Sequence, residues 1–135
     1  MATRKTAREA LAGLFSVSEE GFTVINPFLP LSLNGASKIL NIFARASSLK
    51  VSSQALKKDF HIFYLDTLVL RLGTAVDEDT SDALHEIIVA AIKANPANNN
   101  WQRIELDGET EIRPVEDSGK QYLRERHRVK VKLPG

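Results

Sequence analysis

The chain has 135 residues, of which 43% are hydrophobic and 26% are charged. This length and composition are typical of one globular domain that can bury a core, so we expect a single domain over residues 1–135. It contains no cysteine, which excludes disulfides, thiolate metal sites and cysteine nucleophiles. No apolar run approaches the roughly 20 residues that cross a bilayer, so we expect no membrane partner. The formal net charge of +1 is unevenly distributed, because Lys120–Leu133 carries six basic residues and one acid and the rest carries −4.

The N-terminal segment predicts an amphipathic surface helix. Thr6 and Glu9 have the spacing of a capping box. An apolar stripe follows at helical intervals: Ala7, Leu11, Leu14 and Phe15. We interpret the segment as a helix of the fold rather than a secretory signal or transit peptide, because it lacks a continuous apolar core and contains an acid.

A short strand at residues 22–25, ended or confined to a sheet edge by Pro27, is expected next. The proline-rich stretch after it carries the apolar residues Phe28, Leu29 and Leu31. Apolar anchors in a long loop either pack beneath the loop itself or contact a partner. We therefore keep these three residues as candidate interface residues.

Two apolar segments lie in the middle of the chain. Residues 38–46 have spacings that suit a helix or a strand, and their content of Ile and Phe favours a strand. Residues 48–59 are interpreted as a polar hairpin arm or a mobile loop. The clearest strand spans residues 59–72 and ends at Gly73. One of its faces has Phe60, Ile62, Tyr64, Leu68, Leu70 and Leu72, and the other has His61, Phe63, Leu65 and Val69. Apolar residues on both faces predict a central strand that is covered twice, or one that is covered by a helix on one face and by a neighbouring chain on the other.

The clearest helix spans residues 77–96, with Asp79, Thr80 or Ser81 as its cap and Pro96 as its stop. Its predicted apolar stripe consists of Ala83, Leu84, Ile87, Ile88, Ala91 and Ile92. Its first turns carry the acids Asp77, Glu78, Asp79 and Asp82. Acids in a first turn are favoured by the helix dipole, so we prefer capping to a metal or acid–base role. They remain candidate interface residues.

The C-terminal third predicts strands. A short strand over residues 101–106 is followed by Asp107 and Gly108, a hairpin signal, and by an edge segment with Pro114. The last strand alternates, with Arg124, Arg126, Arg128, Lys130 and Lys132 on one face. Its other face has Leu123, Glu125, His127, Val129, Val131 and Leu133. The cations are interpreted first as a solvated face, second as a partner surface and third as a contact to DNA.

No motif for catalysis or for a cofactor is present. The histidines at positions 61, 85 and 127 have no metal-binding spacing, so a zinc site is not predicted. Glycines occur singly, without a phosphate-binding loop, and there is no nucleophile elbow. We expect no catalytic, cofactor-binding or metal-binding residue and no enzymatic activity.

The order of these elements resembles the tail terminator (tail completion) proteins of long-tailed bacteriophages. Four stretches carry the resemblance: "REALAGLF", "FHIFYLDTLVLRL", "SDALHEIIVAAIKANP" and "WQRIEL" with "YLRERHRVKVKL". The resemblance implies an α+β fold, a mixed, mainly antiparallel sheet with two amphipathic helices packed on one face. It also implies a structural virion protein without catalytic residues or cofactors.

The resemblance further implies a homohexameric ring at the junction of tail and neck. Such a ring caps the tail tube, stops its polymerisation, contacts the head–tail connector and lets genomic DNA pass. The protein would be made in the host cytoplasm and end in the virion. The alternative hypothesis is a small nucleic-acid-binding accessory protein that uses the basic strand, with Tyr122 and Trp101 as contacts. An enzyme whose site is invisible in the sequence is the third hypothesis.

Overall fold

The computed structural model describes residues 3–15, 22, 24–26, 37–50, 58–73, 76–117 and 119–134. The elements in these ranges are α1 (Arg4–Gly13), β1 (Val24–Asn26), β2 (Lys38–Lys50), β3 (Lys58–Leu70), α2 (Val76–Ala94), β4 (Arg103–Leu106), β5 (Glu111–Asp117) and β6 (Lys120–Lys132). Neither described helix combines the length and the apolar content that crossing a bilayer requires. The candidate interface residues Phe28, Leu29 and Leu31 lie outside the described residues.

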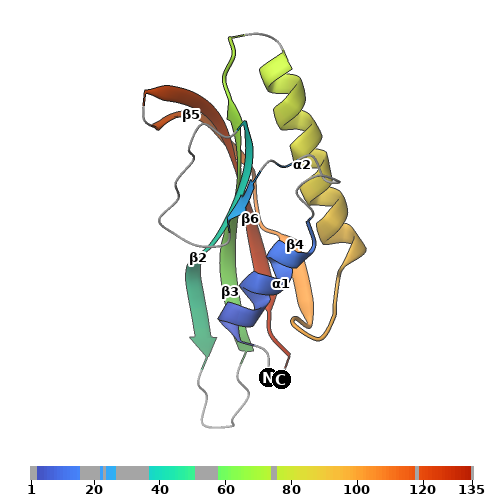
Figure 1. The fold of residues 1–135 in the computed structure, drawn as a ribbon. Helices are drawn as coiled ribbons and strands as arrows, with labels where there is room; N and C mark the ends of the chain where they lie inside the picture. Colours follow the sequence, from blue (N-terminus) through green and yellow to red (C-terminus); the bar gives the residue numbers. More distant parts are fainter. Residues whose placement is uncertain are drawn as a thin grey trace.

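The strands form one six-stranded sheet with the order β1-β2-β3-β6-β4, and β5 also pairs with β6. β1 pairs with β2 in parallel, whereas the other pairs are antiparallel, so the expected mixed, mainly antiparallel sheet is confirmed. Residues 38–46 are in a strand, as their composition favoured, and this strand continues to Lys50, into the stretch interpreted as a hairpin arm or loop. Residues 51–57 of that stretch lie outside the described residues. β3 is central, between β2 and β6, as its two apolar faces predicted. Figure 1 shows β3 and β6 running along much of the length of the sheet.

Both helices pack on the same face of the sheet, which confirms the expected α+β architecture (Figure 1). Alternate residues of β2, β3 and β6 point toward the helices, because side chains alternate along a strand. Their apolar members form the main core with the helix stripes and Trp101. The fully or nearly fully buried members from these strands and helices are Ala7, Leu11, Leu40, Ile42, Phe63, Leu65, Val69, Leu84, Ile88, Ile92, Val129 and Val131.

The cap of α1 differs from the prediction. Thr3 is the N-cap, and its hydroxyl accepts from the backbone N–H of Thr6 at 3.1 Å. The Thr6 hydroxyl in turn accepts from the backbone N–H of Thr3 at 2.7 Å, which completes the capping box. The box therefore lies three residues earlier than the predicted pair of Thr6 and Glu9, because a second threonine provides the reciprocal bond. Glu9 instead lies 3.9 Å from Lys5 on the exposed side of the helix.

α2 also begins earlier than predicted, at Val76 rather than after Asp79. The buried carboxylate of Asp77 accepts from the backbone N–H groups of Leu72 and Gly73 at 3.0–3.2 Å. These bonds hold the chain that leaves β3, so β3 ends at Leu70 and the side chain of Leu72 is exposed. Ala83, predicted in the stripe, is exposed because the buried line runs through Asp77, Ser81, Leu84, Ile88 and Ile92.

The hairpin predicted at Asp107 and Gly108 is wrong. β4 and β5 do not pair with each other; they pair with successive parts of β6, residues 103–106 with 129–132 and residues 111–117 with 120–126. Asp107 still bonds to β6, from its N–H to the carbonyl of Arg128 at 2.8 Å. The segment is therefore an interruption within one edge rather than a reversal of the chain, because β6 is long enough to pair with both strands.

Candidate functional site

The face of the sheet opposite the helices, called the open face below, displays the cations of β6. Arg124, Arg126, Arg128, Lys130 and Lys132 share it, as their alternation predicted, while Val129 and Val131 point to the core. Partly buried aromatic rings of β2 and β3 lie beside them: Phe43, Phe60 and Tyr64. No described helix covers this face.

Arg126 is held more firmly than the other cations. Its Nε and Nη2 donate to the two carboxylate oxygens of Asp66 at 2.9 and 2.8 Å, a bidentate pair across β3 and β6. The guanidinium carbon also lies 4.3 Å from the ring centre of Tyr64 and 5.4 Å from that of Phe43. The hydrogen bonds to Asp66 raise the pKa of Arg126 above its ordinary value, although partial burial opposes this. Arg126 is therefore chiefly a structural cation.

The other cations are less constrained. Nε of Arg128 lies 3.1 Å from a carboxylate oxygen of Asp107, and the Arg128 side chain is half exposed. Arg124 lies 4.0 Å from Glu111, which also pairs with Arg113, and Lys130 lies 4.6 Å from the ring centre of Phe60. Lys132 has no ion-pair partner within the described ranges. Of these five cations, Arg128, Lys130 and Lys132 are consequently the ones that a partner can contact with the least loss of existing interactions.

A second surface lies at the start of α2. The predicted interface acids Glu78, Asp79 and Asp82 are exposed there. Asp77 is buried and bonded to backbone, so it leaves the set of candidate interface residues. The exposed large apolar side chains of the described ranges accompany the acids: Leu72, Val76 and Ile112, exposed by 73%, 60% and 56%.

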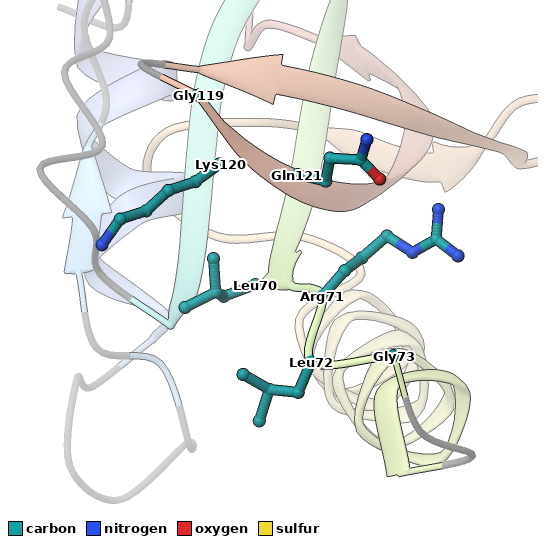
Figure 2. Close-up of a pocket in the computed structure, with 7 residues that line it drawn as sticks. All are labelled: Leu70, Arg71, Leu72, Gly73, Gly119, Lys120 and Gln121. Carbon is teal, nitrogen blue, oxygen red and sulfur yellow. The ribbon is translucent and has the colours of Figure 1, made fainter.

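Ile112 lies close to the acids, because it lines a hollow of about 240 Å³ together with Glu78 and Asp82. Leu72 is held to the first turn of α2 through Asp77. This apolar and acidic group is called the α2 patch below and consists of Leu72, Val76, Glu78, Asp79, Asp82 and Ile112. The α2 residues and Ile112 lie on the helix-covered side, whereas the cations occupy the open face. The side chain of Leu72 points away from the helix, beside Leu70 (Figure 2).

The two aromatic side chains proposed to stack on nucleic acid are both buried. Trp101 packs in the main core, and its indole Nε1 donates to the carbonyl of Asn95 at 2.9 Å. Tyr122 lies in a smaller cluster with Ile39 and Leu68, and burial raises the pKa of its hydroxyl. Neither ring is accessible to a base. The part of the nucleic-acid hypothesis that relied on these two contacts is therefore wrong.

A hollow of about 530 Å³ lies at the junction of β3 with the β5–β6 turn (Figure 2). Its lining consists of Leu70, Arg71, Leu72, Gly73, Gly119, Lys120 and Gln121. Figure 2 shows the long side chains of Arg71 and Lys120 pointing away from each other, so the two cations do not converge. The lining offers no carboxylate, imidazole or hydroxyl, and the backbone N–H of Arg71 is already bonded to the carbonyl of Gln121 at 2.8 Å. We assign no chemistry to it.

Beneath α2, the structure joins three titratable side chains that the sequence had left apart. Nδ1 of His85 lies 2.8 Å from Nε2 of His127 and 3.6 Å from Oε2 of Glu125. The same carboxylate oxygen accepts from the hydroxyl of Thr110 at 2.7 Å. His127 is fully buried, which lowers its pKa, so its ring is neutral near pH 7. These three residues, His85, Glu125 and His127, are called the His85 cluster below.

Sequence reasoning missed this cluster and the acid Asp66. The two histidines are 42 residues apart, so no spacing rule for metal sites applies to them. The available signal was the pair Glu125 and His127, two polar residues on the otherwise apolar face of β6. Asp66 gave a similar signal on β3, as a lone acid among apolar residues that share the open face. A buried acid in such a place calls for a cationic partner.

The sequence matches no protein-family model and no curated protein. Nineteen chains of solved structures match the fold. One of these matches is described as "Virion of native gene transfer agent (GTA) particle"; it has a TM-score of 0.56 at 14% sequence identity. The match covers 96% of this chain and 94% of that chain. At this identity the likeness establishes a shared fold over nearly the full length of both chains.

Proposed function

We propose that this protein is a structural component of a phage-like virion, and that it acts as the tail terminator. In this role, copies of the chain form a ring that caps the tail tube, stops its growth and joins it to the head–tail connector. The observation that carries the proposal is the fold shared with a chain of a gene transfer agent virion over almost the whole of both chains. The predicted location is the junction of tail and neck.

The two surfaces described above support a ring. A ring of identical copies needs two different patches on each subunit that fit each other. Here the open face offers Arg128, Lys130 and Lys132, and the α2 patch offers acids around three exposed apolar side chains. The two patches carry opposite charge, and the acids of α2 lie on the other side of the sheet from the cations. A contact of one patch with the other on the next copy would continue around a ring.

The α2 patch has the composition of an interface rather than of an ordinary surface. Exposed large apolar side chains within a rim of charged groups are typical of protein–protein contact sites. The open face adds cations that have few competing partners. Opposite charge on two patches favours encounter in the correct orientation and disfavours contact between like patches. We take a hexamer as the proposed ring number, from the resemblance stated above.

Native mass spectrometry of the protein mixed with the tube protein of its own particle tests the proposal. The wild type is expected to give a closed ring of one size, bound to tubes. Charge reversal on either patch alone, as Lys132→Glu or Asp82→Lys, should abolish the ring, and the combined variant should restore part of it. Glu116→Lys, an exposed reversal on β5, is the matched control. A chain that stays monomeric beside its tube protein contradicts the proposal.

Of the residues on which the nucleic-acid alternative relied, only the cations of β6 remain available for contact. It predicts binding to DNA that weakens steeply with salt, since each phosphate contact releases a counterion. With Trp101 and Tyr122 buried, no base stacking is expected from these two residues. A filter-binding series from 50 to about 300 mM salt, on the wild type and on Arg128→Ala, distinguishes this alternative from a ring without DNA contact.

A further inference from the structure

The His85 cluster has the donors and the arrangement of a metal site. One ligand atom from each of His85, Glu125 and His127 lies within 4.8 Å of the others. Two imidazole nitrogens and one carboxylate oxygen form a donor set that suits Zn²⁺ and related ions, and that suits Mg²⁺ or Ca²⁺ poorly. We propose that these three residues bind a divalent transition-metal ion, with Zn²⁺ as the first candidate, and that the ion fastens α2 to β6.

The two separations that involve His85 are close to those of a bound site. Ligand atoms about 2.0–2.1 Å from a tetrahedral zinc ion lie roughly 3.3–3.4 Å from each other. The distance from His85 to Glu125, 3.6 Å, is slightly longer, and that from His85 to His127, 2.8 Å, is shorter. Opening the histidine pair by about half an ångström would bring it into this range. The ligand atoms of Glu125 and His127, which lie within 4.8 Å of each other, would also have to come to roughly 3.4 Å.

The outer contacts of two ligands are already in place. Nδ1 of His127 lies 3.2 Å from the carbonyl of Leu65, which can only accept, so Nδ1 carries the proton and Nε2 offers its lone pair to the cluster. Thr110 donates to Glu125 and fixes its carboxylate. Metal-binding histidines commonly donate their second N–H to a backbone carbonyl, and such outer partners orient the ligands.

His85 is the side chain that must adjust. Its ring plane lies 24° from that of His127 with centroids 5.0 Å apart, so the two nitrogens face each other nearly within one plane. Since Nε2 of His127 is the acceptor, Nδ1 of His85 holds the shared proton. To bind a metal ion, His85 would take its other tautomer, with the ring proton on Nε2, so that Nδ1 of His85 and Nε2 of His127 both offer a lone pair to the ion. Because the side chain of His85 is 31% exposed, its ring has room to tilt.

The exposed side of His85 gives an ion a way in and leaves a position for water. Glu125 and His127 are buried, so solvent reaches the cluster from the His85 side. With three protein ligands, a zinc ion keeps one position open for water. The ion would join residues that are 40 and 42 positions apart in the chain. Its expected effect is on stability, and this does not depend on the proposed role in a tail.

The test uses the untagged full chain, stripped with a chelator and titrated with Zn²⁺ by calorimetry. One Zn²⁺ per chain is expected, with no binding of Mg²⁺, and a rise in Tm of roughly 5–10 °C at 100 times Kd. On loading, the ¹⁵N shifts should change at Nδ1 of His85 and at Nε2 of His127. Binding through His61, or no stoichiometric binding, would overturn the proposal.

Variants separate coordination from folding. His85→Ala should keep the far-UV spectrum, because alanine is a good helix former, and should weaken Zn²⁺ binding more than about 100-fold. Thr110→Val, which removes only the outer bond to Glu125, should weaken it roughly 10- to 100-fold. The matched control Glu86→Ala changes an exposed neighbour on α2 and should bind as the wild type does. Equal affinity of His85→Ala and Glu86→Ala would refute the site.

Discussion

Replacing Arg126 by alanine should destabilise the fold strongly, because it leaves the buried carboxylate of Asp66 without its partner. The Asp66 side chain is 5% exposed and that of Arg126 is 25% exposed. Loss of one member of a buried pair costs about 3–5 kcal/mol, and the exposure of Arg126 points to the lower end. The lost contact with the Tyr64 ring adds about 0.5–1 kcal/mol. We expect a total of roughly 3–4 kcal/mol.

Urea unfolding, followed by far-UV circular dichroism and by the fluorescence of the single tryptophan, Trp101, measures this cost. A loss of this size should lower Tm by roughly 10 °C in a domain of this length. Arg103→Ala is the control, since this arginine pairs with Glu105 at 3.1 Å but is 69% exposed, and it should cost less than about 0.5 kcal/mol.

A double variant tests the physical reason. If the penalty of Arg126→Ala comes from an unpaired buried charge, then Asp66→Leu together with Arg126→Met should be more stable than Arg126→Ala alone. Apolar replacement of a whole buried pair is often neutral or stabilising. A cost of Arg126→Ala below about 1 kcal/mol, or a double variant no more stable than that single one, would refute the reasoning.

Three further predictions concern stability and are measured by the same unfolding assay. Trp101→Ala should cost about 3–5 kcal/mol through the cavity that it leaves in the core; a cost near zero would place the ring outside the core. Asp77→Ala should lower the free energy of unfolding by about 1–2 kcal/mol, because it leaves two backbone N–H groups without their acceptor. Asp79→Ala, at an exposed position, should change it by less than about 0.5 kcal/mol, and equal effects of the two variants would contradict the assigned bonds. Gly119→Ala should lower the free energy of unfolding by about 1–2 kcal/mol, because φ at this position is +79°. Gly13→Ala, in the last turn of α1, should raise it by up to about 1 kcal/mol, and the reverse order of the two effects would contradict the turn geometry.

Much of the fold follows from local patterns in the sequence. The alternation of β6 correctly placed its five cations on one face and its valines on the other. The stripe of α2 and the central position of β3 were predicted from hydrophobic periodicity in the same way. These predictions hold because period and burial are coupled wherever one face of an element is covered.

The wrong predictions concern hydrogen bonds and strand pairs for which the sequence offers more than one partner. Two threonines three residues apart form the cap of α1, where the sequence also offered a threonine followed by Glu9. Asp107 and Gly108 have the composition of a hairpin turn, yet the length of β6 lets two strands pair with it in succession. Spacing rules describe one segment at a time, so they do not determine which segments pair.

The candidate sites were predictable only in part. The cations of the open face and the exposed acids of α2 were identified from charge alone. The ion pair of Arg126 with Asp66 was not predicted, because the two residues are 60 positions apart in the chain. The His85 cluster likewise depends on packing α2 against one register of β6. Contacts of this kind are set by the tertiary fold and leave no periodic signal in the sequence.

The central claim is that the protein acts by assembling on a tube, and electron microscopy of tail tubes tests it most directly. Tube protein polymerised with the wild-type chain should give tubes of limited length that carry a ring of density at one end. The variant Asp82→Lys should leave tubes long and uncapped. Tubes whose length and ends are unchanged by a stoichiometric amount of the wild-type protein would contradict the claim.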